Sequence, residues 1–203
     1  MQQTMKKTKF LSTSKLVKIS ILSAIGYILM FISIPLPMLF PDFLKIDISD
    51  LTALLGGISL GPMAGVTIAF LKNLLQFITG MSNTGGVGEF ANFLIGGSFV
   101  FTYIYSKKRE LSGVVIGLIS GMVIMTIVGC ISNYFIILPF YETIGWPIET
   151  VVAMGAAINP VIDSKMSFVI WMIAPFNILK SGLISLLTLP MYKKTEKVLN
   201  RVK

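Results

Sequence analysis

The sequence contains no histidine and only one cysteine among its 203 residues. The absence of histidine excludes histidine-based acid–base catalysis and histidine metal ligands. A lone Cys130 excludes an internal disulfide and a cysteine zinc site, and its place in an apolar run is typical of a small packing residue. Charged residues make up 13% of the chain, against the roughly 25% that is usual in soluble domains.

The usual machinery of an enzyme or a carrier is also missing. No predicted span carries paired carboxylates, and a Ser-His-Asp set is impossible without histidine. The glycine-rich stretch 80–88 fits neither GxGxxG nor GxxxxGK, so no phosphate-binding loop is predicted. No internal repeat of the kind that builds alternating-access carriers is present. We therefore expect no enzymatic activity, no cofactor and no metal site.

Apolar residues dominate what is there: they form 54% of the chain, and the mean hydropathy is +0.83. This composition predicts an all-α polytopic membrane protein that forms one integral-membrane domain over residues 1–203. Thirteen of the 17 Lys and Arg residues fall in three clusters, which the positive-inside rule explains without nucleic-acid binding. The clusters are Lys6, Lys7, Lys9, Lys15 and Lys18; Lys107, Lys108 and Arg109; and Lys193, Lys194, Lys197, Arg201 and Lys203.

The number of spans depends on the run from 51 to 71, which is interrupted at Gly61 and Pro62. One unbroken helix gives five spans and places Lys108 outside, whereas a break gives six spans and places all three basic clusters inside. We therefore predict six transmembrane helices with cytoplasmic N- and C-termini. They cover about 15–34, 47–61, 62–79, 89–106, 111–138 and 166–192, with a capping loop at 35–46.

Polar side chains inside the apolar runs are the candidate functional residues. Asn177 and Lys180 lie three apart, so on a helix they share one face. A lysine at membrane depth is unfavourable unless it faces a cavity or a partner, which makes the pair a candidate site. The alternative is a buried hydrogen bond that holds helices together.

Three predicted helices bring polar groups to one level near the outer face. They carry the pair Glu89 and Asn92, then Asn133, then Asn177 with Lys180. The loop 35–46 lies on the same side and contributes apolar residues, among them Met38, Phe40, Phe43 and Leu44. A mostly apolar lining with a few placed polar groups is typical of a ligand pocket. The alternative for the loop is an interfacial belt of aromatic residues. A pocket without an energy source indicates a binding subunit that depends on partners.

Three motifs resemble a known family: PDFLKIDIS at 41–49, SNY at 132–134 followed by PFY at 139–141, and APFNILK at 174–180. Their order and spacing resemble the substrate-binding S components of the energy-coupling-factor (ECF) transporters, most closely the riboflavin-specific members. The resemblance implies six helices, an outward-facing vitamin pocket, and a first loop that acts as a lid. It also implies a transmembrane coupling protein (the T component) and two ATP-binding-cassette ATPases as partners, in a plasma membrane of the Gram-positive type.

Riboflavin suits such a pocket chemically. Its isoalloxazine ring has a uracil-like edge, to which the amides of Asn133 and Asn177 can offer both donors and acceptors. We expect Lys180 to donate to a ring carbonyl or nitrogen. The remaining candidates divide into two groups: Met38, Phe40, Phe43 and Leu44 for the ring or its methyl side, and Lys45, Asp47, Glu89 and Asn92 for the ribityl hydroxyls or the bonds of the loop itself.

The family also implies a docking motif for the coupling protein on the first helix. Its small-xxx-small pattern reads SILSA at 20–24, so that Ser20 stands where the family has alanine and Ala24 is retained. Serine is still small enough for close helix approach. The alternative is ordinary packing within the bundle.

Other functions remain open at the level of sequence. An S component for another vitamin, such as thiamine or biotin, would share the fold but have a more strongly charged pocket. A stand-alone secondary carrier would transport without ATP and would use Glu89 or Lys72 as coupling groups. A membrane-embedded enzyme is disfavoured because the catalytic sets are missing.

Overall fold

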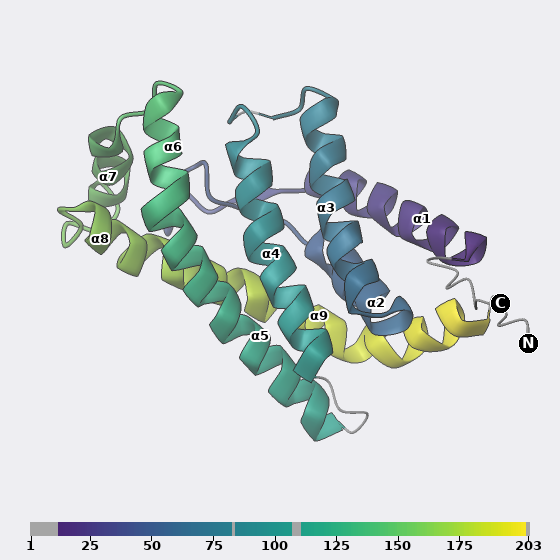
Figure 1. Cartoon of the computed structure of the whole chain (residues 1–203). Coiled ribbons are helices and arrows are strands. Elements are labelled where there is room, and N and C mark those ends of the chain that lie inside the picture. Colours follow the sequence, from purple (N-terminus) through teal and green to yellow (C-terminus); the bar gives the residue numbers. More distant parts are fainter. Residues whose placement is uncertain (1–11, 83, 107–110, 202–203) are drawn as a thin grey trace, which may run out of the picture.

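The computed structural model describes residues 12–82, 84–106 and 111–201, and it is mostly helical. Figure 1 shows the helices gathered into one bundle. The regular elements, in chain order, are α1 (Thr13–Met30), β1 (Ile34–Pro35), β2 (Lys45–Ile46), α2 (Asp50–Leu60), α3 (Pro62–Ile78), α4 (Val87–Ser106), α5 (Leu111–Ser132), η1 (Asn133–Ile137), α6 (Leu138–Thr143), α7 (Ile148–Ala156), α8 (Lys165–Phe168), η2 (Val169–Ile173) and α9 (Ala174–Arg201). The two η segments are π-helical turns within longer helices.

Three helical runs in the described part of the chain are long and apolar enough to cross a membrane: Thr13–Met30, Ser112–Thr143 and Lys165–Met191. Two shorter apolar helices, Asp50–Leu60 and Pro62–Ile78, lie between the first two of these. The run at 51–71 is divided at Gly61, whose φ of 101° is readily adopted only by glycine. Pro62 then occupies the first turn of α3, where its missing N–H has no helical partner to lose.

Helix α2 is the centre of the bundle. Nine of its eleven residues are buried, and it packs against α1, α3, α4 and α9. Two backbones approach each other closely where Gly57 of α2 meets Gly65 of α3, because a Cβ at 65 would lie 2.9 Å from the Gly57 Cα. A helix enclosed in this way can present polar side chains to the interior without exposing them to lipid.

The observed helix ends differ from the predicted spans in several places. Helix α1 ends at Met30 instead of 34 because the chain turns there into a short antiparallel hairpin. In that hairpin Ile34 pairs with Ile46 and Pro35 with Lys45, so the predicted capping loop is a closed hairpin loop. Helix α2 begins at Asp50 instead of 47, and α4 begins at Val87 instead of 89. The last two runs continue to Thr143 and Arg201, beyond the predicted 138 and 192.

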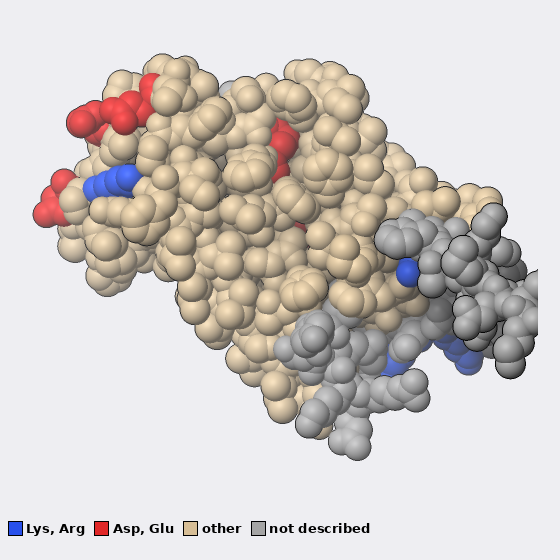
Figure 2. Space-filling view, viewed as in Figure 1, with Lys and Arg blue, Asp and Glu red and all other residues tan. Residues whose placement is uncertain are grey.

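The two ends of the bundle differ in charge. Helix α1 begins and α9 ends on the same side of the molecule, opposite α6, α7 and α8 (Figure 1). Figure 2 shows acidic side chains gathered at the end formed by α6, α7 and α8. Three residues of the basic C-terminal cluster, Lys193, Lys194 and Lys197, are exposed near the end of α9. The cluster Lys107, Lys108 and Arg109 lies outside the described residues.

Candidate ligand-binding site

A cavity of about 410 Å³ lies between the hairpin loop and helices α3, α4, α5, α6 and α9. Its volume falls in the range of roughly 300–1,000 Å³ found for small-molecule sites. Nine of the eleven predicted ligand-binding residues line it: Phe43, Leu44, Lys45, Asp47, Glu89, Asn92, Asn133, Asn177 and Lys180. The other two do not, since Met38 is 90% exposed and Phe40 is buried beside the cavity. The structure therefore brings candidates from four separate segments to one cavity: the hairpin region, α4, η1 and α9.

The two asparagines are positioned by the same local device. Asn133 Nδ2 donates to the Gly129 carbonyl at 2.8 Å, and Asn177 Nδ2 donates to the Ile173 carbonyl at 2.8 Å. Each bond runs from the amide to the carbonyl four residues earlier in the same helical run, close to a π-helical turn. Asn133 begins η1, whereas Ile173 ends η2. One N–H of each amide is thereby fixed, and an oxygen and a second N–H remain for a ligand.

Gly129 of α5 brings the two amides together. Its carbonyl accepts the bond from Asn133, and its Cα faces Asn177, because a Cβ at 129 would lie 2.6 Å from the Asn177 Nδ2 atom. Only a glycine leaves room for the Asn177 amide in its present orientation.

Lys180 is almost fully buried, and all of its polar contacts lead to other helices and the hairpin. Its ammonium donates to Asn92 Oδ1 at 2.8 Å and to Asp47 Oδ2 at 2.9 Å. It also lies 3.4 Å from Asp50 Oδ2. The amide of Asn92 in turn donates to Asn73 Oδ1 at 3.2 Å. Buried charge at membrane depth is thus compensated by carboxylates and an amide.

Lys180 is one member of a closed ring of five polar side chains that the sequence did not predict. The other four are Asp47, Ser49, Asp50 and Lys72. Lys72 donates to Asp50 Oδ1 at 2.6 Å and to the hydroxyl of Ser49. Ser49 donates through both its hydroxyl and its backbone N–H to Asp47 Oδ1. Asp47 and Asp50 both face Lys180, which completes the ring. This arrangement corrects the expectation that no span carries paired carboxylates.

The hairpin loop is held over the cavity by aromatic contacts. Phe43 meets the rings of Tyr141, Trp146 and Phe168 at centroid distances of 6.1, 6.1 and 6.4 Å. Phe40 meets Phe176 edge-on at 5.4 Å, which explains why it is buried without lining the cavity. Of these rings, Tyr141, Trp146 and Phe176 line the cavity beside Phe43, so the sequence underestimated its aromatic content.

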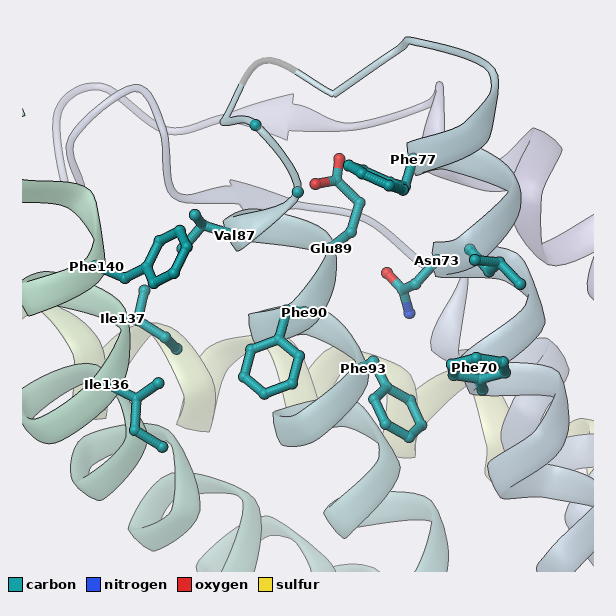
Figure 3. A pocket seen from close by; sticks show the side chains of 13 residues that line it. Phe70, Asn73, Phe77, Val87, Glu89, Phe90, Phe93, Ile136, Ile137 and Phe140 are labelled. Atoms are coloured by element: carbon teal, nitrogen blue, oxygen red, sulfur yellow. The ribbon is translucent and has the colours of Figure 1, made fainter. Parts of the chain in front are cut away.

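A second cavity of about 520 Å³ opens between α3, α4 and the run formed by η1 and α6. Figure 3 shows its walls, which carry five phenylalanine rings: Phe70, Phe77, Phe90, Phe93 and Phe140. The polar side chains that line it are Asn73 and Glu89. Glu89 borders both cavities and accepts a bond from Ser82 at 2.8 Å. This second cavity lacks the convergent polar groups that orient a ligand, so the smaller cavity is the candidate site.

The predicted docking residues Ser20 and Ala24 are both exposed on α1. A different face of this helix is buried through Ser23 and Gly26, and a Cβ at Gly26 would lie 2.5 Å from the Thr52 hydroxyl oxygen. Within this chain, then, the face that carries Ser20 and Ala24 does not pack into the bundle.

Comparison with known proteins gives consistent matches over nearly the whole chain. The family described as "ECF transporter, substrate-specific component" matches residues 14–192. The Riboflavin transporter RibU of Staphylococcus aureus (strain TCH60) is 36% identical over 199 residues, which cover 97% of this chain and 98% of the relative. The Riboflavin transporter FmnP of Bacillus subtilis (strain 168) is 34% identical over 178 residues, which cover 86% and 88%. A solved structure described as the S component of a bacterial ECF transporter aligns with a TM-score of 0.69 and 37% identity, covering 91% of this chain and 96% of that one.

Proposed function

The chain belongs to the substrate-specific components of ECF transporters, and on this premise we propose that the 410 Å³ cavity captures riboflavin. The protein is a riboflavin-binding S component of the family: its relatives from two organisms are named riboflavin transporters. The observation that carries the proposed site is the convergence of nine predicted residues on one cavity. Transport, not catalysis, is the role that these relatives suggest.

The lining matches the two chemical halves of the vitamin. We expect the amides of Asn133 and Asn177 to pair with the uracil-like edge, since each keeps a free oxygen and N–H. Lys180 supplies a charge-assisted donor to the same edge. Phe43, Tyr141 and Trp146 offer flat apolar surfaces for the rest of the ring, and aromatic pairs of this kind contribute about 0.5–1.5 kcal/mol beyond burial.

The ribityl chain needs several hydrogen-bonding partners at the other end of the site. Glu89 and Lys45 line the cavity, and the side chain of Asp42 joins them from the hairpin loop. The carboxylates accept hydrogen bonds and the ammonium donates them. The ribityl hydroxyls, which can do both, therefore find partners as donors and as acceptors. Leu44 contributes apolar surface from the same loop. The loop covers the cavity and therefore acts as the lid.

The bundle crosses the membrane six times in this proposal, with both termini in the cytoplasm. The crossings are α1, α2 with the preceding hairpin, α3, α4, α5 with η1, and η2 with α9. Support comes from the break at Gly61 and from the acidic side chains that gather at the end formed by α6, α7 and α8, opposite the exposed Lys193, Lys194 and Lys197 of α9. The cavity then opens toward the outside of a plasma membrane of the Gram-positive type.

Energy for uptake comes from partner subunits. We propose that α1 docks the transmembrane coupling protein through Ser20 and Ala24, because both are exposed and small residues let helices approach closely. Two ATP-binding-cassette ATPases attached to that protein hydrolyse ATP. This chain contributes recognition and carries riboflavin as transported ligand, without a cofactor of its own.

The test is purification of the chain alone in detergent, followed by visible absorption spectroscopy. A yellow protein that releases riboflavin on denaturation is the expected result. If the vitamin is lost during purification, added riboflavin should quench the fluorescence of Trp146, which lines the cavity. The variant Asn177→Leu should lose this response, whereas Lys194→Ala at the exposed end of α9 should keep it. A colourless protein without quenching would refute riboflavin as the ligand.

A further inference from the structure

The ring of five polar side chains contains two residues that face the cavity and three that do not. Asp47 and Lys180 line the cavity, whereas Ser49, Asp50 and Lys72 are completely buried behind it. Its two lysines and two aspartates carry formal charges that cancel. Removing one charge from such a group leaves another buried and uncompensated, which is strongly unfavourable.

Lys180 has no donor to spare in the structure as it stands. An ammonium carries three N–H groups, and the ammonium of Lys180 faces Asn92, Asp47 and Asp50. The Asp50 contact is the longest, at 3.4 Å, and Asp50 Oδ2 accepts no hydrogen bond from the described residues. A ligand that bonds to Lys180 therefore displaces this contact most easily.

Whether Asp50 releases Lys180 depends on Lys72. The Lys72 ammonium lies only 2.6 Å from Asp50 Oδ1 and neutralises that carboxylate through the oxygen that Lys180 does not contact. Without Lys72, the buried Asp50 carboxylate has Lys180 as its remaining cation. Lys180 would then be drawn inward, away from the cavity.

We propose that Lys72 is a positioning residue for ligand recognition. It holds Asp50, and through Ser49 it holds Asp47, so that the N–H of Lys180 that faces Asp50 can be released to the bound ligand. This inference rests on the proposed riboflavin site and adds to it two residues, Lys72 and Asp50, that never touch the vitamin.

The test compares riboflavin affinity among the wild type, Lys72→Met, Asp50→Asn, the double variant and the control Lys194→Met. The Lys72→Met variant should bind riboflavin about 10- to 100-fold more weakly than the wild type, because it loses the hydrogen bond from Lys180 to the ligand. This factor is the equivalent of one charge-assisted hydrogen bond. In the Asp50→Asn background the same change should alter affinity by no more than about threefold, which is near the limit of additivity. Lys72 thus matters only while Asp50 is charged.

A pH profile separates charge from packing. In Lys72→Met the ring carries one uncompensated negative charge, so its affinity should depend on pH more steeply than that of the wild type. The double variant should follow the wild type. The other charged or titratable groups that border the ring and the cavity are Asp42, Lys45, Glu89, Tyr141 and Lys180, and these are common to all the proteins compared.

The outcomes distinguish this inference from the proposed function. A wild type that binds no riboflavin overturns both. Where the wild type binds, an unchanged affinity in Lys72→Met overturns the inference alone, as does an equal loss in the Asp50→Asn background. If Lys72→Met alone does not fold, the comparison within the Asp50→Asn background can still overturn the inference, because a change in affinity of more than about threefold there would show that Lys72 does not act through Asp50.

Discussion

The substitution Gly129→Ala tests the site without removing any of its polar groups. A Cβ at this position would lie 2.6 Å from Asn177 Nδ2 and 3.0 Å from its Cγ, and the three nearest atoms that it would meet all belong to the Asn177 side chain. The amide must therefore turn away, while the backbone of α5 and α9 stays where it is. The substitution thereby moves the Asn177 amide away from the position in which it would bind the ligand.

The size of the effect follows from these distances. Non-bonded heavy atoms prefer separations of about 3.5–4.0 Å, so the amide must shift by about 1 Å. Such a shift is larger than the tolerance of hydrogen-bond lengths, which span about 2.7–3.2 Å. Two neutral hydrogen bonds to the ligand contribute about 1–3 kcal/mol together, which corresponds to a loss in affinity of about 5- to 150-fold.

Folding stability should respond differently from binding. Alanine is favoured over glycine in a helix by about 1 kcal/mol, which offsets the lost bond from Asn177 to the Ile173 carbonyl. We expect the free energy of unfolding of ligand-free Gly129→Ala to stay within about 1 kcal/mol of the wild type. Affinity falls while stability holds, and this combination identifies a displaced ligand contact.

The assay is a riboflavin titration of purified protein in detergent, followed by flavin fluorescence, with thermal unfolding measured on the same samples. Gly182→Ala is the matched control, since a Cβ there would meet Met122 at an ordinary 3.8 Å. An affinity of Gly129→Ala equal to that of the control would show that Asn177 does not bind the ligand. A parallel loss of affinity and unfolding temperature would point to general disruption and would also refute the reasoning.

Three further outcomes are expected. Lys180→Ala should weaken riboflavin binding about 10- to 100-fold, as expected for one charge-assisted bond, while Lys194→Ala leaves the same titration unchanged. Ser20→Phe or Ala24→Phe should abolish uptake by the complete transporter in vesicles yet leave binding by the isolated chain intact, because the exposed face of α1 is blocked; a variant that loses both has no specific docking defect. A cysteine introduced at Lys108 should react with membrane-impermeant reagents from the cytoplasmic side only, and labelling from outside would contradict six spans.

The sequence predicted the polar residues of the cavity because membrane depth makes them conspicuous. Asn133, Asn177 and Lys180 stand alone in long apolar runs, where an unpaired polar group is unfavourable. Their helical periodicity also fixes which face they share. The same reasoning located the break at Gly61, where a glycine and a proline interrupt an apolar run.

The side-chain directions in the hairpin loop were harder to predict, because its apolar residues follow neither a helical nor a strand periodicity. Met38, Phe40 and Phe43 are equally apolar, and nothing in their spacing tells which of them turns inward. The structure directs Met38 outward, packs Phe40 against Phe176 and places Phe43 among three aromatic rings. These differences arise from the pairing of β1 with β2, which is a tertiary feature of the chain.

Lys72 shows what a charge count at membrane depth can add to motif reading. Asp47 and Asp50 lie three residues apart, as Asn177 and Lys180 do. Both aspartates belong to the ring, but of the other two residues only Lys180 does. The sequence alone suggested a role for Lys72 only as a coupling group of a stand-alone carrier. Yet Lys72 and Lys180 lie well inside predicted spans and need compensating carboxylates, and the start of the second span offers two. Counting charges across spans predicts that these four residues meet, whereas the assignment of Lys180 to the cavity and Lys72 to the interior depends on how α2 packs between α3 and α9.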